Sequence, residues 1–177
     1  MKPMIVYYSH TGNNQALALK LKDFLICDSL EIKEKKKRKT ITILFDLMFN
    51  RKAKIIEYPV FNFNDRVIIF ISPIWVGKIA SPIKAYIEKE KNNINKYFFI
   101  SLCGGDDNHQ QKLKDMLRNI TQKEPLEVLE LSLNSLLPEE KRNQIKHLIN
   151  FRVSDNDFDI YKNEINQFID KVNNACI

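Results

Sequence analysis

Short apolar runs alternate along the chain with segments in which apolar residues recur every three or four positions. The runs 66–71 and 97–102 are continuous and rich in β-branched and aromatic residues, which is typical of strands buried on both faces. With three weaker runs they predict strands at 5–8, 29–32, 66–71, 97–102 and 126–133. Helical spacing in the other segments predicts helices around 17–25, 40–50, 79–87, 113–120 and 161–172, and one that starts at Pro138.

Strands that alternate with helices predict an α/β fold with a parallel sheet covered on both faces. Five such units fit a doubly wound five-stranded parallel sheet of order 2-1-3-4-5, with helices on both faces. We find no repeat and no linker, so we expect one domain over 1–177. Ligands of such sheets bind outside the carboxyl ends of the strands, where the strand order reverses.

The turn 9–15 joins the first predicted strand to the first predicted helix. Ser9 and Thr11 supply hydroxyl groups, and Gly12 allows a tight turn with close approach of the backbone. The first N–H groups of a helix have no partner within the helix, so this place suits a phosphate. An ordinary strand-to-helix turn with Asn13 as the N-cap is the alternative. One glycine is too few for a dinucleotide fingerprint, and the Gly-Lys-Ser/Thr of a nucleotide P-loop is absent.

Two further loops follow predicted strands, at 72–78 and 101–107. They follow the third and fourth strands, which with the first strand surround the point where the strand order reverses. The agreement of three loops therefore predicts a ligand site at this edge of the sheet.

Composition excludes several other classes of function. Nine basic and three acidic residues lie between Glu31 and Lys54, so this segment carries the whole net charge of +6. A nucleic-acid-binding protein would spread or stripe that charge, so we expect no nucleic acid as partner. No run is long enough to cross a bilayer. Three cysteines without metal-ligand spacing predict no metal site and suit a reducing, cytoplasmic location.

The pattern Ser9-x-Thr11-Gly12-Asn13 resembles the phosphate-binding loop of flavodoxins, with Asn14 in place of the last threonine, where an amide can also donate. The loop Pro73-x-Trp75 is similar to that of short bacterial and archaeal flavodoxins. The resemblance extends from Met4 to about Leu133, and the remaining residues share only their helical character.

This resemblance implies FMN as the cofactor. The first loop would hold the phosphate, Trp75 would stack on the isoalloxazine ring, and backbone groups near Cys103 would contact the polar edge of the ring. The implied cofactor-binding residues are Ser9, His10, Thr11, Gly12, Asn13, Asn14, Pro73, Ile74, Trp75, Val76, Gly77, Cys103, Gly104 and Gly105.

Three of these residues have a second interpretation. Trp75 could be a core residue, although its place beyond the strand and after Pro73 favours stacking. Cys103 could be a reactive thiol, but we expect a small packed residue because no nearby cation would lower its pKa. We expect the side chain of His10 to point to solvent.

No acid–base or nucleophile constellation appears in the sequence, so no catalytic residue is assigned and a flavodoxin that carries electrons is favoured. An FMN-dependent reductase that uses NAD(P)H and a quinone is the alternative. A flavin-free binding or regulatory module is the second alternative. The basic segment 33–39 is a solvated loop or a docking site for an acidic redox partner protein. Flavodoxins that serve as soluble carriers are generally acidic, so this chain departs from them.

Overall fold

A computed structural model describes residues 1–36, 53–105 and 109–177. The helix expected over 40–50, the end of the basic segment (37–39) and residues 106–107 of the third loop lie outside the described residues. Within the described part of the chain, no helix is both long and apolar enough to span a membrane.

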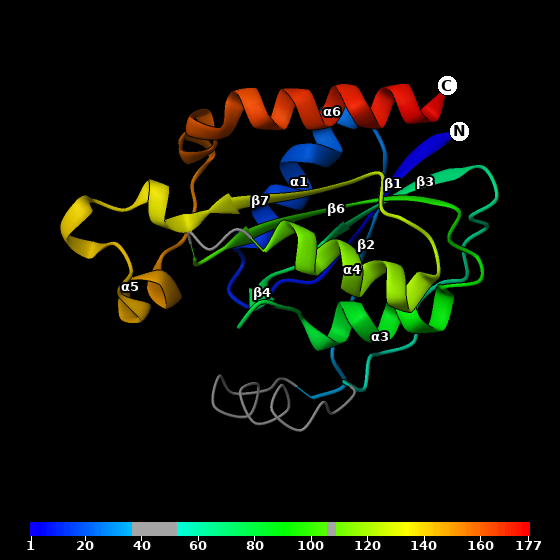
Figure 1. The fold of residues 1–177 in the computed structure, drawn as a ribbon, viewed down its shortest axis with the longest axis horizontal. Helices are drawn as coiled ribbons and strands as arrows, with labels where there is room; N and C mark the ends of the chain where they lie inside the picture. The colour runs from blue at the N-terminus through cyan, green and yellow to red at the C-terminus, as the bar shows by residue number, and fades with distance from the viewer. Residues whose placement is uncertain (37–52, 106–108) are drawn as a thin grey trace.

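The core of the fold is a five-stranded sheet in the order β2-β1-β3-β6-β7 (Figure 1). All neighbouring strands are parallel. The strands are β1 (Lys2–Tyr7), β2 (Asp28–Glu31), β3 (Arg66–Ile71), β6 (Lys96–Cys103) and β7 (Glu127–Ser132). This is the predicted order 2-1-3-4-5, and the expected doubly wound α/β fold is confirmed.

Helices cover both faces of the sheet, as Figure 1 shows. On one face lie α1 (Asn13–Leu25) and α6 (Lys162–Cys176), and on the other α3 (Ser81–Glu90) and α4 (Gln110–Thr121). Successive strand residues point to opposite faces. In β6, Phe98 therefore packs in the core below α1 and α6, while Phe99 packs in the core below α3 and α4. Each face thus has its own apolar core.

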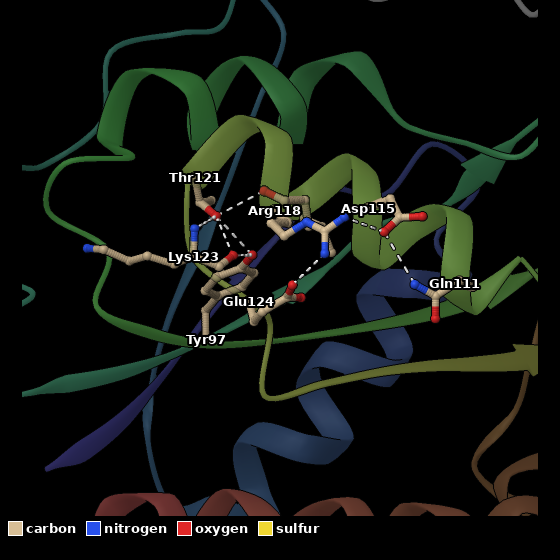
Figure 2. A network of polar contacts seen from close by, with 8 residues as sticks. Tyr97, Gln111, Asp115, Arg118, Thr121, Lys123 and Glu124 are labelled. Carbon is tan, nitrogen blue, oxygen red and sulfur yellow. Dashed lines mark hydrogen bonds and ion pairs between the residues drawn. The ribbon is translucent and has the colours of Figure 1, made fainter.

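A polar network holds α4 to the sheet at the end far from the predicted site (Figure 2). The Tyr97 hydroxyl donates to the Lys123 backbone oxygen at 2.8 Å and lies 3.0 Å from Thr121 Oγ1. Burial raises the pKa of Tyr97 to about 12, so it stays a neutral hydrogen-bonding group. On the surface, Arg118 bridges Asp115 and Glu124. These contacts fix the C-terminal end of α4 and leave its N-terminal end at the ligand side.

The predicted loop 72–78 contains a small antiparallel hairpin, β4 (Ile74–Trp75) and β5 (Lys78–Ile79). Its two turn residues, Val76 and Gly77, have φ of 51° and 64°. Positive φ at both central residues is the requirement of a two-residue type I′ hairpin. Sequence reasoning missed this hairpin because the usual residue at the first turn position is Asn or Asp. The third loop also starts later than expected, since β6 continues to Cys103.

The helix expected to start at Pro138 is wrong. After β7 the chain forms the 3-10 turns η1 (Leu133–Leu136) and η2 (Glu139–Lys141), then the short α5 (Ile145–Asn150) and the 3-10 segment η3 (Asp155–Tyr161). No helix runs through this segment, because Asn143, which exchanges hydrogen bonds with the buried Asn134, has φ of 58°. A residue in the left-handed region cannot continue a right-handed helix.

Candidate functional site

A cavity of about 500 Å³ lies at the carboxyl ends of β1, β3 and β6, where the strand order reverses. Its volume is within the range of about 300–1,000 Å³ typical of small-molecule sites. The residues that line it are His10, Thr11, Asn13, Asn14, Pro73, Ile74, Trp75, Val76, Leu102, Cys103, Gly104, Gly105, Leu133, Ile145, Leu148 and Ile149. The three loops predicted from the sequence therefore meet at one cavity.

The first turn places the N-terminus of α1 at this cavity. Gly12 is the N-cap, with φ of 97°, and its N–H donates to Ser9 Oγ at 3.0 Å. The interpretation of Asn13 as an ordinary N-cap is therefore wrong, since Asn13 is the first helical residue. The Ala16 N–H donates to Gly12 O at 2.9 Å, as the first turn of the helix requires. The N–H groups of residues 13–15 thus precede the internal hydrogen bonds of the helix and can serve an anion.

The side chain of Asn14 has a structural role at the same turn. It is 3% exposed, its Nδ2 donates to Leu102 O at 2.9 Å, and its Oδ1 accepts from Leu102 N at 3.0 Å. This pair ties the first turn of α1 to β6. What Asn14 can offer a ligand is therefore mainly its backbone N–H, rather than the amide donor expected from the sequence.

Trp75 forms one wall of the cavity. Its ring meets the rings of Tyr8 and His10 edge to face, each at 6.0 Å between centroids. It also packs at the margin of the core below α3 and α4, so the interpretation as a core residue holds in part. Stacking on a bound ring stays a prediction. The expectation that His10 points to solvent is wrong, because its ring contacts Trp75 and lines the cavity.

The third loop supplies another wall of the cavity. Cys103 is 6% exposed, as expected of a small packed residue, and it lines the cavity together with Gly104 and Gly105. Gly104 lies under Leu148, since a Cβ at this glycine would be 3.5 Å from Leu148 Cδ1. The loop thus presents mostly backbone to the cavity.

Three of the predicted site residues do not line this cavity. Ser9 and Gly12 instead shape the first turn, through the hydrogen bond from Gly12 N–H to Ser9 Oγ. Gly77 lines an adjoining cavity of about 390 Å³, which shares Ile74, Val76, Cys103 and Gly105 with the first.

Sequence reasoning missed five residues that line the main cavity, namely Leu102, Leu133, Ile145, Leu148 and Ile149. Three of them lie in α5 at helical spacing. That spacing predicts an apolar helix face, but nothing in it indicates that the face turns to a ligand site.

A buried carboxyl and a histidine lie beside the adjoining cavity. The side chain of Glu130 is 8% exposed, and neither carboxylate oxygen has a hydrogen-bond partner of normal geometry among the described residues. His109 Nδ1 lies 3.5 Å from Glu130 Oε2. Burial raises the pKa of Glu130, and His109 opposes that rise. A side chain at Gly77 would bring its Cβ within 3.0 Å of the His109 ring and of Lys112 Nζ.

Charged side chains and metal-binding clusters are both absent from the described lining of the main cavity. None of the described residues lining the main cavity is Asp, Glu, Lys or Arg. Across the ranges 1–36, 53–105 and 109–177, no group of three or more His, Cys, Asp and Glu side chains is placed to hold a metal ion. The cavity offers apolar walls, two aromatic rings and backbone hydrogen-bonding groups.

The solved structures of similar fold include flavoproteins. A flavoprotein from Lactobacillus acidophilus NCFM, in complex with FMN, has a TM-score of 0.59 and 20% sequence identity over 73% of this chain and 92% of its own. The apo form of the flavoprotein from the same organism gives a TM-score of 0.54 at 19% identity, over 76% of this chain and 94% of its own. A protein from Bacteroides eggerthii DSM 20697 gives 0.61 at 18% identity, over 79% and 91%.

No protein-family model matches the chain, and no curated protein matches it in sequence. At these identities the solved structures establish a shared flavodoxin-like fold and nothing finer.

The Asn14 side chain gives a first prediction. Replacing Asn14 by Ala leaves the Leu102 N–H and C=O unpaired, at about 1–3 kcal/mol for each buried group. We expect urea unfolding of Asn14→Ala to show a loss of that size. The control Asn93→Ala removes an exposed contact to Glu90 and should cost less than about 0.5 kcal/mol. Equal losses in the two variants would contradict the structural role.

The Glu130 pair predicts a pH dependence of stability. A carboxyl whose folded pKa lies above its ordinary value of 4.5 binds its proton more tightly in the folded state. The stability that this carboxyl contributes to the folded state is therefore fully present below its unfolded pKa. It is lost as pH rises through the folded pKa. In urea unfolding from pH 4 to 8, the free energy of unfolding of Glu130→Gln should increase relative to that of the wild type as pH rises. The control is Glu139→Gln, in the exposed turn η2. A parallel pH profile of wild type and Glu130→Gln would show that the carboxyl is not perturbed.

Proposed function

We propose that this protein binds FMN and acts as a flavodoxin-type electron carrier. The observation that carries the proposal is the meeting of three features at one cavity. These are the N-terminus of α1, the indole of Trp75 and the backbone of the 103–105 turn. The similar fold of a flavoprotein in complex with FMN supports the choice of cofactor.

The described residues fit such a cofactor. Thr11 and the first N–H groups of α1 would hold the phosphate, because the helix dipole is positive there. Trp75 gives an aromatic wall for a planar ring, and the backbone of Cys103 to Gly105 gives hydrogen-bonding groups for its polar edge. When bound, the flavin supplies the redox chemistry, while the protein sets orientation and electrostatics.

A carrier is favoured over an enzyme because acid–base side chains are scarce at the cavity. His10 is the sole titratable side chain of the ordinary acid–base types among the described residues that line it, apart from the buried thiol of Cys103. Consumption of NAD(P)H by the purified yellow protein alone, with a quinone as acceptor, would instead favour the reductase. A colourless protein that does not take up FMN would favour the flavin-free module.

The test compares FMN with riboflavin, which lacks the phosphate, by fluorescence titration of the apoprotein. Thr11→Val keeps the shape of the side chain and removes its hydroxyl. We expect it to weaken FMN binding roughly tenfold or more, since hydrogen bonds to charged groups contribute about 1.5–3 kcal/mol. Riboflavin binding should stay unchanged. Equal losses for both ligands would mean that the turn acts through the fold and not on a phosphate.

We further propose that the basic segment 33–39 receives an acidic redox partner. Its described part lies close to the Trp75 wall, because the Tyr8 hydroxyl donates to Glu34 Oε2 at 3.2 Å and the Tyr8 ring packs on Trp75. Lys35 and Lys36 are exposed. A partner attracted to these lysines would therefore arrive beside the proposed cofactor site.

Long-range attraction of this kind weakens with salt, because the Debye length falls to about 8 Å at physiological ionic strength. We expect Lys35→Gln with Lys36→Gln to slow electron transfer to an acidic partner and to flatten its salt dependence. Stopped-flow kinetics at several ionic strengths measure both. The matched control replaces Lys141 and Lys162, which are exposed in η2 and α6. An unchanged salt slope in the first variant would leave the segment without a role in docking.

A further inference from the structure

The short helix α5 presents apolar side chains to the cavity and buries none of its residues. Ile145 is 72% exposed and Ile149 is 42% exposed, yet both line the cavity together with Leu148. In Figure 1, α5 lies beyond the carboxyl ends of the strands, apart from the helices that cover the sheet. Its apolar face is therefore turned to the cavity, and Leu148 also packs at the margin of the core below α1 and α6.

A helix of this length is not stable by itself, so its position depends on tertiary contacts. Leu148 packs on Gly104 of the third loop. At the other end, the side chain of Asn13 bridges the chain that follows α5. Asn13 Nδ2 donates to Phe151 O at 3.1 Å, and Val153 N donates to Asn13 Oδ1 at 3.2 Å. The helix is thus attached to the first and third loops of the cavity.

We propose that α5 forms a second wall for the flavin ring, through Ile145, Leu148 and Ile149, and that Asn13 is the positioning residue for this wall. The proposal rests on the proposed function and adds a ring-binding element outside the region that resembles flavodoxins. An uncharged planar ring is the occupant because the cavity is continuous with Trp75 and with the α1 N-terminus, and its described lining holds no charged side chain. Covering the exposed isoleucines would remove apolar surface from water on binding.

The variants for the test change exposed positions, so they leave the core intact. Ile145→Ser with Ile149→Ser alters the wall. The matched control is Ile160→Ser, because Ile160 is 54% exposed, lies in η3 and does not line the cavity. Calorimetric titration of each apoprotein with FMN and with riboflavin gives the affinities.

We expect the double variant to bind both ligands about tenfold more weakly, or about 1.4 kcal/mol, and by the same factor for each. The control should match the wild type. Asn13→Ala should weaken both ligands as well, because it releases the segment that follows α5. Hydrogen exchange of residues 145–150 should slow when FMN or riboflavin is added, and should not change with inorganic phosphate.

The outcomes separate this inference from the proposed function. If the wild type binds neither FMN nor riboflavin, the proposed function fails and the wall fails with it. If the wild type binds FMN and the double variant binds it equally well, the proposed function stands and the wall is overturned. If Asn13→Ala binds both ligands like the wild type while the double variant does not, the positioning role of Asn13 is overturned.

Discussion

The carboxyl end of the sheet depends on two buried asparagines at the start of α1. Asn14 pairs with the backbone of Leu102 in β6, and Asn13 pairs with the backbone on either side of Arg152. Their amide groups can donate and accept at once, so each satisfies one backbone N–H and one C=O. These hydrogen bonds fix the positions of β6 and of the segment after α5 relative to the first turn of α1. The cavity exists because these three pieces are held at fixed positions.

The sheet could be predicted from the sequence because its central strands are buried on both faces. Such strands read as continuous apolar runs, as in Val67 to Ile71, and their alternation with helices predicts a parallel sheet. The three loops were predictable for the same reason, since parallel strands all end at one edge. Most of the residues with which these loops line the cavity could therefore be predicted without knowledge of their side-chain partners.

The part after β7 could not be predicted, because its structure depends on contacts distant in sequence or on single backbone angles. Asn143 pairs with Asn134, and its left-handed backbone stops a helix from running through this segment. Leu148 is placed by Gly104, more than forty residues earlier. His10 was misplaced for a similar reason, because its partner Trp75 comes from another loop. Periodicity describes a helix face, but it does not say which element lies opposite.

Departures from local preference gather around the two adjoining cavities. Val76 is β-branched and yet has φ of 51°, a conformation that such residues rarely adopt. The Ser101 hydroxyl and the Glu130 carboxylate, which are neighbours in the β6–β7 register, are buried, and neither has a hydrogen-bond partner of normal geometry among the described residues. Each departure costs about 1–3 kcal/mol and persists where the surrounding structure holds it or where function selects it. Neither Ser101 nor Glu130 is among the residues that line the two cavities, whereas His109, whose Nδ1 lies 3.5 Å from Glu130 Oε2, lines the adjoining one. Any electrostatic effect of the Glu130 carboxyl on a ring in the proposed site would therefore act from behind the cavity lining.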